Sequence, residues 1–210
     1  MFRLVLLSLI GGILLGCQLA PSPAATPSAP VRSGRLAYIG GDGNVYITTP
    51  DRSQTVAVTN DATVAAEYPG RSYHRLSWSP DGWLAFAAVT RSGSQTRSTL
   101  YVAETPAAPP RIVGQSDQHF VIYIYWSPTA CPDQPSTCRR LAYLIEEDDS
   151  ISLRLVELEA NRVDNRRVGQ GRPFYFAWSP DGRRMVWHTG GARRHNERAK
   201  LVLYDIERGQ

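Results

Sequence analysis

Short apolar runs alternate with polar stretches along residues 34–210, and the runs come in pairs. The first members of the pairs are alike: Leu36-Ala37-Tyr38, Leu84-Ala85-Phe86, Leu141-Ala142-Tyr143 and Met185-Val186-Trp187. The second members follow after a polar stretch: Val45-Tyr46-Ile47, Leu100-Tyr101-Val102, Leu153-Arg154-Leu155 and Leu201-Val202-Leu203. Short runs rich in aliphatic and aromatic residues, bounded by Gly, Pro, Asp and Ser, are typical of β-strands. The pattern therefore predicts strand pairs, with a polar loop at residues 91–98 inside the second unit.

One phrase precedes three of these pairs. Trp78-Ser79-Pro80-Asp81-Gly82 recurs as Trp178-Ser179-Pro180-Asp181-Gly182, and a shortened copy begins at Trp126. The copies start at positions 78, 126 and 178, which are 48 and 52 residues apart. Pro presets φ, Asp bonds to the backbone ahead of it, and Gly accepts positive φ, so the phrase predicts a tight turn. The tryptophan ends the preceding strand and brings a large ring to the same place in each unit. The predicted structural positions of the repeat are Trp78, Asp81, Gly82, Trp126, Trp178, Asp181 and Gly182.

A repeat of this length with up to four strands is typical of a β-propeller blade. The phrase and the strand after it resemble the TolB-like (WD-repeat-like) β-propeller repeat over residues 34–210. The resemblance implies an all-β fold of about four blades, each of four antiparallel strands, at residues 34–61, 73–113, 120–168 and 174–210. It also implies a binding platform in the cell envelope. The competing interpretation is an ordinary β-sandwich that contains chance copies of a turn.

The ring is expected to be open or incomplete, because propellers of this kind usually close with six or seven blades. The first unit lacks a good innermost strand and the last lacks its outermost strand. Three explanations remain open at this point. The chain is the N-terminal portion of a longer propeller, a degenerate small propeller, or an arc that closes by self-association.

The N-terminus has the features of a secretion signal. Residues 4–15 are apolar, follow Arg3, and are too few to span a bilayer. The run ends in Leu14-Leu15-Gly16-Cys17, which resembles the signal of bacterial lipoproteins. The resemblance implies a signal peptide over residues 1–16, lipid on Cys17, and an extracytoplasmic, membrane-anchored location. Residues 17–33 are rich in Pro, Ala and Ser and predict an extended tether. A plain secretory signal with an unmodified Cys17 is the alternative.

The other two cysteines, Cys131 and Cys138, flank a loop in the third unit. This loop replaces the four-residue turn found at Ser79–Gly82 with twelve residues, so it lacks the self-closing phrase. We predict a disulfide that restores the closure, as expected in an oxidising compartment. A metal-binding pair is the alternative, but no nearby histidine supplies further ligands.

Charge and motifs argue against several classes of function. The formal net charge is +4, with both signs spread along the chain, which is not typical of a nucleic-acid-binding protein. The sequence contains no Gly-x-Ser-x-Gly, His-Glu-x-x-His or phosphate-binding loop. The four histidines, His74, His119, His188 and His195, are not clustered. We therefore expect no catalysis, cofactor or metal. The alternative is the propeller portion of a larger hydrolase whose catalytic domain is absent from this chain.

A protein or peptide partner is the expected ligand. In a propeller, the loops between second and third strands lie on one face with the connections between blades. That face is predicted to carry cations from the second and fourth units and acids from the third: Arg91, Arg97, Arg193, Arg194, His195 and Arg198, with Glu146, Glu147, Asp148 and Asp149. Alternating charge of this kind would orient a partner. Solvated loops without a partner, and a carbohydrate site using Tyr68, Tyr73 and Tyr123, are the other interpretations.

Overall fold

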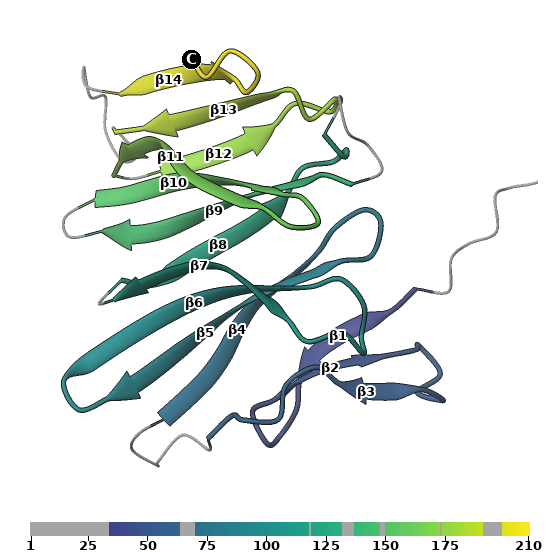
Figure 1. Ribbon diagram of the computed structural model, residues 1–210. Helices are drawn as coiled ribbons and strands as arrows, with labels where there is room; N and C mark the ends of the chain where they lie inside the picture. The colour runs from purple at the N-terminus through teal and green to yellow at the C-terminus, as the bar shows by residue number, and fades with distance from the viewer. Residues whose placement is uncertain are drawn as a thin grey trace, which may run out of the picture. The chain divides into compact units, whose positions relative to one another are not determined.

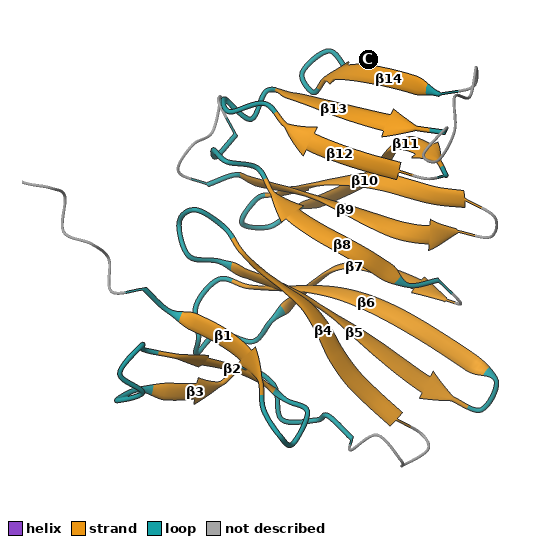
Figure 2. Cartoon of the chain, turned by 180° about the vertical axis from the view of Figure 1, so that it is seen from behind, coloured by secondary structure: helices purple, strands orange, loops and turns teal. Residues whose placement is uncertain are grey.

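The computed structural model describes residues 34–63, 70–117, 119–131, 137–147, 150–172, 174–190 and 199–210. Every regular element among these residues is a β-strand, and the strands form four antiparallel sheets (Figures 1 and 2). No helix capable of spanning a membrane occurs in the described part of the chain. The all-β prediction is confirmed, and the sheets are not closed into a ring.

The first two sheets follow the predicted order along the chain. The first sheet contains β1 (Leu36–Ile39), β2 (Val45–Thr48) and β3 (Thr55–Ala57) in the order β1-β2-β3. The second sheet contains β4 (Gly70–Trp78), β5 (Leu84–Ser92), β6 (Gln95–Ala103) and β7 (Arg111–Asp117), also in chain order. Neighbours in sequence are neighbours in the sheet, so each sheet is a meander with short connections.

The third and fourth sheets repeat the arrangement. The third sheet contains β8 (Val121–Trp126), β9 (Arg139–Glu147), β10 (Ser150–Leu158) and β11 (Val163–Gly171). The fourth contains β12 (Phe174–Trp178), β13 (Arg184–Thr189) and β14 (Lys200–Asp205). Among the described residues, the first sheet begins with the strand that follows the turn in the other sheets. The fourth sheet ends at its third strand.

The core consists of three apolar layers, one at each junction between consecutive sheets. Val45 and Ile47 of the first sheet pack with Leu84 and Phe86 of the second. A second cluster joins the second and third sheets and includes Trp126, which is 3% exposed. A third cluster joins the third and fourth sheets. Each inner sheet therefore buries both of its faces, as blades of a propeller do.

The repeated phrase forms the expected turn. Gly82 and Gly182 have φ of +97° and +67°, and each donates its N–H to the carbonyl of the serine three residues earlier. The serine hydroxyls donate to the aspartates, Ser79 to Asp81 at 2.7 Å and Ser179 to Asp181 at 2.5 Å. The turn thus holds its own shape, and the Trp126 indole N–H reaches the preceding sheet by donating to the Ser77 carbonyl at 2.9 Å.

The predicted loop at residues 91–98 was wrong. Strand β5 continues to Ser92 and β6 begins at Gln95, so only Gly93 and Ser94 form the connection. Backbone pairing extends the hairpin through polar residues such as Arg91 and Arg97, because backbone hydrogen bonds do not require apolar side chains.

Candidate partner-binding surfaces

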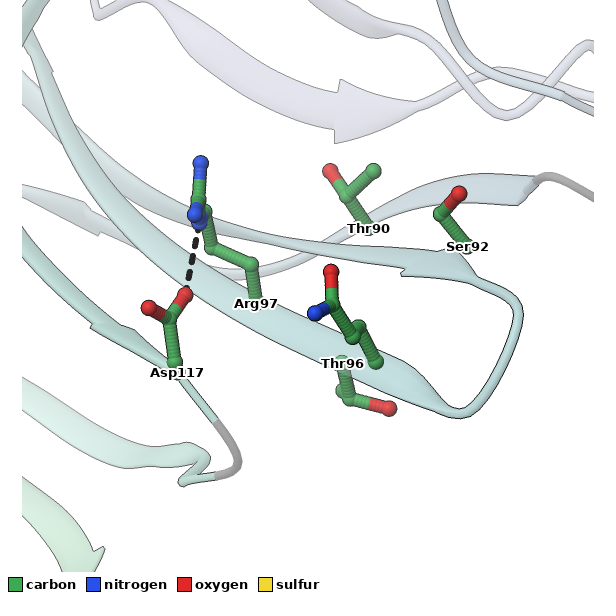
Figure 3. Close-up of a pocket in the computed structure, with 6 residues that line it drawn as sticks. Thr90, Ser92, Thr96, Arg97 and Asp117 are labelled. Carbon is green, nitrogen blue, oxygen red and sulfur yellow. Dashed lines mark hydrogen bonds and ion pairs between the residues drawn. The ribbon is translucent and has the colours of Figure 1, made fainter.

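The first candidate surface is the predicted charged rim, at the end of the sheets that carries the β5–β6 hairpin. Arg97 donates from Nε to Asp117 Oδ1 at 2.7 Å, across the β6–β7 pair. This hydrogen bond and the charge of Asp117 raise the pKa of Arg97. Both side chains line a cavity of about 350 Å³ (Figure 3), whose other lining residues are Thr90, Ser92, Gln95 and Thr96. The residues that line the cavity are polar or charged, and its arginine is already paired, while Arg91 lies exposed on β5.

The two described acids of the rim, Glu146 and Glu147, are also paired with nearby arginines. Glu147 accepts hydrogen bonds from Ser152 at 2.6 Å and from Arg154 Nη2 at 3.2 Å, and Arg167 lies 3.5 Å away. Burial raises the pKa of Glu147, but the bonds from Ser152 and Arg154 outweigh it and hold the pKa below its usual range. Glu146 pairs with Arg172 at 2.7 Å.

Arg97, Glu146 and Glu147 are therefore paired with neighbouring side chains, whereas Arg91 is exposed, and the alternating charge of the rim stays a prediction. Cross-strand ion pairs of this kind satisfy each other within a sheet. The remaining predicted rim residues, Asp148, Asp149, Arg193, Arg194, His195 and Arg198, lie outside the described residues.

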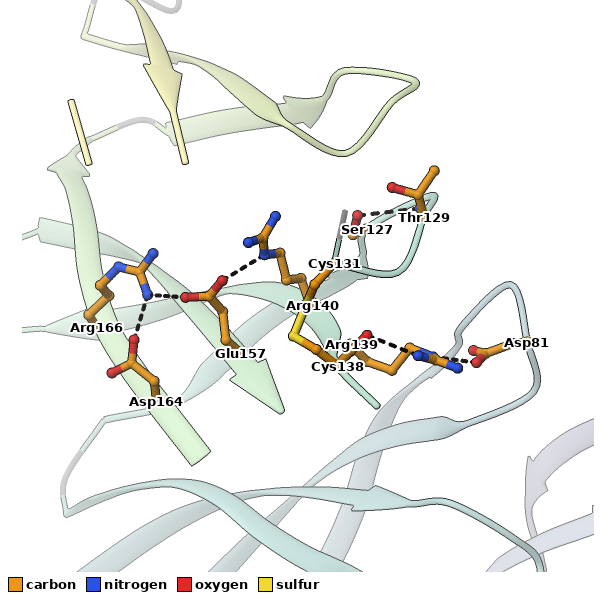
Figure 4. The surroundings of a disulfide bond; sticks show 10 residues. All are labelled: Asp81, Ser127, Thr129, Cys131, Cys138, Arg139, Arg140, Glu157, Asp164 and Arg166. Atoms are coloured by element: carbon orange, nitrogen blue, oxygen red, sulfur yellow. Dashed lines mark hydrogen bonds and ion pairs between the residues drawn. A yellow bond between two sulfur atoms is a disulfide. The ribbon is translucent and has the colours of Figure 1, made fainter. Parts of the chain in front are cut away.

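The opposite end of the sheets carries the turns and the disulfide (Figure 4). Cys131 and Cys138 form the predicted disulfide with a Cα–Cα distance of 5.4 Å, and Cys131 N–H donates to the Cys138 carbonyl at 3.3 Å. Next to it, Arg139 forms an ion pair with Asp81 of the second sheet, and its guanidinium lies 5.6 Å from the centre of the Trp83 ring. The disulfide thus lies in the connection between β8 and β9, next to an arginine that contacts the second sheet.

A partly buried ion network lies beside the disulfide. Arg140 Nε donates to Glu157 at 2.7 Å, and Arg166 Nη1 donates to Glu157 at 2.6 Å and to Asp164 at 2.5 Å. Burial raises the pKa of Glu157, but the hydrogen bonds from Arg166 and Arg140 outweigh it and leave the pKa below its usual value. The Arg140 side chain is 8% exposed, and its Nη1 has no hydrogen-bond partner among the described residues. The network connects β9, β10 and β11 of the third sheet and gives its partly buried charges partners.

Another candidate surface is an aromatic cluster on the first strands of the third and fourth sheets. Tyr123 and Tyr125 of β8 lie 6.2 Å apart between ring centroids, and Phe176 of β12 lies 6.0 and 6.3 Å from them. Tyr123 and Tyr125 remain 48% and 46% exposed. Both strands are at the edge of their sheets, so the cluster adjoins backbone that pairs with no other described strand. We call Tyr123, Tyr125 and Phe176 the aromatic cluster.

Of the tyrosines predicted for a carbohydrate site, Tyr123 is in this cluster and Tyr68 lies outside the described residues. Tyr73 is 7% exposed and donates its hydroxyl to Asp61 at 2.5 Å, so its prediction as an exposed platform was wrong. Burial and this hydrogen bond raise the pKa of Tyr73. Sequence reasoning missed Tyr125 and Phe176, although the alternation Tyr123-Ile124-Tyr125 was a visible signal that both tyrosines share one face.

The described residues hold no group of three or more His, Cys, Asp or Glu side chains arranged to bind a metal. His74 is half-buried, its Nε2 lies 3.3 Å from the Val121 carbonyl, and burial lowers its pKa. It therefore connects the second and third sheets. Cys17 lies outside the described residues.

No family model matches the sequence, and no curated protein sequence matches it either. Among solved structures, the chain is similar to the crystal structure of TolB from Acinetobacter baumannii, with 16% sequence identity and a TM-score of 0.46. The match covers 85% of this chain and 40% of the TolB chain. The propeller-type architecture is accordingly assigned from the four repeated sheets of this chain.

Proposed function

We propose that this protein is a lipid-anchored, extracytoplasmic scaffold of the propeller type that binds a protein or peptide partner and has no catalytic activity of its own. The lipoprotein-like sequence at Cys17 and the disulfide between Cys131 and Cys138 support a location outside the cytoplasm. The observation that carries the binding proposal is the half-exposed aromatic cluster.

The aromatic cluster has the chemistry of a binding centre. Tyrosine side chains offer large, rigid contact area with few rotatable bonds, and their hydroxyls bond at the rim of a contact. The described rim residues Arg97, Glu146 and Glu147, by contrast, are already paired with neighbouring side chains. Binding energy at protein interfaces concentrates in aromatic residues of this kind.

The backbone beside the cluster suits an extended segment. Strands β8 and β12 each have one neighbour, β9 and β13, so their outer edges carry N–H and C=O groups that no described strand pairs. Such an edge accepts an added strand, whose side chains then meet the exposed rings. We propose that the partner presents an extended peptide along these edges.

The test uses the full chain in the envelope of the producing cell. A photoreactive benzophenone amino acid is placed at Tyr123 or Tyr125, and in a control at Ile112, which is 51% exposed on β7. The proposal predicts adducts with another protein from positions 123 and 125 and none from 112. Equal adducts at all three positions, or none at any, would contradict it. Retention of the chain on cell-wall glycans that a Tyr123→Ser variant loses would support the carbohydrate alternative instead.

A further inference from the structure

The second and third sheets use the same four positions on one face, which we call the forward face, at the junction with the sheet that follows. In the second sheet these positions are Ala85 and Ala87 on β5, paired with Val102 and Leu100 on β6. In the third sheet they are Ala142 and Leu144 on β9, paired with Leu155 and Leu153 on β10. All eight side chains are at most 6% exposed, because the next sheet covers them.

The fourth sheet has the same four positions without a cover among the described residues. They are Val186 and His188 on β13, paired with Leu203 and Leu201 on β14. Leu201 and Leu203 are 75% and 65% exposed. The opposite face of these strands is buried against the third sheet through Met185, Trp187 and Tyr204. The exposed leucines therefore occupy positions that a following sheet buries elsewhere in the chain.

In each junction, the forward face of one sheet packs against the opposite face of the next sheet, which we call the rear face. The rear face carries an equivalent pair of apolar residues in each sheet. The pair is Leu84 and Phe86 in the second sheet, Leu141 and Tyr143 in the third, and Met185 and Trp187 in the fourth, all at most 5% exposed. The first sheet carries the same kind of pair, Leu36 and Tyr38, at the equivalent positions of β1. These two are 54% and 43% exposed, and Tyr38 stacks on Tyr46 at 5.5 Å.

We propose that the forward face of the fourth sheet binds the rear face of the first sheet of a second copy of this chain. The occupant is inferred from complementarity, since these two faces are the two halves of the junction that the chain forms between its second and third sheets and again between its third and fourth. Because the faces differ, the contact is head-to-tail, and two copies would place eight sheets in one assembly. That number lies within the about four to eight blades of propellers, and a head-to-tail contact closes into a ring when its rotation allows.

Two tagged versions of the full chain test the contact when they are produced together in one cell. One carries Leu203→Cys and the other Tyr38→Cys, and the envelope is then mildly oxidised. The proposal predicts a disulfide that joins the two differently tagged chains. When the two tagged chains carry the same cysteine substitution, they form no disulfide-linked dimer. In a head-to-tail contact, the same position of two copies does not come together. A Ser94→Cys chain, altered at the exposed β5–β6 connection, replaces Leu203→Cys as the matched control and forms no link to Tyr38→Cys.

Three results would overturn the proposal. They are the absence of the mixed dimer, an equal yield with Ser94→Cys, and a link from either face to a different protein. A double variant, Tyr38→Cys with Leu203→Cys, that links only within one chain would also overturn it, because the sheets would then close on themselves.

A mass measurement keeps the test independent of cysteine chemistry. Sedimentation of the detergent-solubilised full chain is expected to show a dimer whose dissociation constant rises at least tenfold in Leu203→Asp. Ile112→Asp, which changes another exposed apolar residue, on β7, is expected to leave the dimer unchanged. Both positions are exposed, so neither substitution prevents folding. A monomer in the native chain, or no difference between the two variants, would contradict the proposal.

Discussion

The indole N–H of Trp178 donates to the backbone carbonyl of Tyr125 at 3.2 Å, so the repeated tryptophan of the fourth sheet bonds to the first strand of the third. Trp126 makes the same bond to Ser77 one sheet earlier. In both cases the acceptor is the residue just before the preceding copy of the tryptophan. The repeat in the sequence therefore corresponds to a repeated bond between sheets, in addition to a repeated turn within each sheet.

The two turn glycines predict a difference between otherwise matched substitutions. Gly182→Ala and Gly82→Ala both place a side chain at positive φ, which costs about 1 kcal/mol. A Cβ on Gly182 would lie 2.3 Å from Thr129 Oγ1 and 2.5 Å from Ser127 Oγ of the third sheet, whereas nothing lies within 4 Å of one on Gly82. We expect Gly182→Ala to lower the free energy of unfolding by about 1–3 kcal/mol more than Gly82→Ala. Equal losses in chemical denaturation would show that the turn of the fourth sheet does not pack on the third.

The disulfide predicts a loss of stability under reducing conditions. Replacing Cys131 and Cys138 together by Ser is expected to lower the free energy of unfolding by about 2–4 kcal/mol, the usual effect of releasing a closed loop. Reduction of the native chain is expected to give a similar loss in chemical denaturation. The serine variant serves as the control, because a reductant leaves its stability unchanged. A native chain that is equally stable with and without reductant would rule out a stabilising bridge.

The ion network beside the disulfide predicts an acid-dependent contribution from Glu157. Its folded pKa lies below the usual 4.5, so its contribution to stability is present above that pH and is lost as the pH falls through the lower folded value. Glu157→Gln is therefore expected to cost about 1–3 kcal/mol at neutral pH. The difference in the free energy of unfolding between Glu157→Gln and the native chain is expected to narrow below pH 4.5. Thermal denaturation across this range measures the gap, and Glu207→Gln, which alters an exposed residue, serves as the control. A gap that does not depend on pH would mean that the charge of Glu157 is not what stabilises the network.

The proposed anchor predicts a covalent modification at one cysteine. Cells supplied with labelled palmitate are expected to label the native chain, and Cys17→Ala is expected to abolish that labelling. A chain with Cys131 and Cys138 both replaced by Ser is the matched control and should keep the label. Labelling that persists in Cys17→Ala would show that Cys17 is not the residue that carries the lipid.

The sequence predicts the strands where one face is buried, because burial demands the alternation of apolar and polar residues. The strands of the β5–β6 hairpin continue past the residues that show this alternation. Around Arg91 and Arg97 both faces are polar, and backbone pairing alone continues the strands. The ion pairs of Glu147 could not be predicted from the sequence either, since they depend on which residues become neighbours across β9, β10 and β11.

Two irregularities lie next to Tyr73, which was wrongly predicted to be exposed, and Tyr123, which was correctly predicted to be exposed. Strand β4 shifts register between His74 and Ser77, and β8 shifts between Val121 and Tyr123. A bulge adds a residue and reverses which face the following side chains occupy. Tyr73, just before the shift in β4, points into the core, and Tyr123, just after the shift in β8, is exposed. Alternation counted along the sequence does not reveal a bulge.

Exchange of the tryptophan indole protons with solvent tests most directly whether the repeated tryptophan connects one sheet to the next. The chain has five tryptophans, and Trp126→Phe and Trp178→Phe assign two of the five indole signals in the NMR spectrum. We expect these two protons to exchange more slowly than that of free indole, with the stronger protection at Trp126, which is 3% exposed. Exchange of both protons at the rate of free indole would contradict the packing of the sheets as consecutive blades.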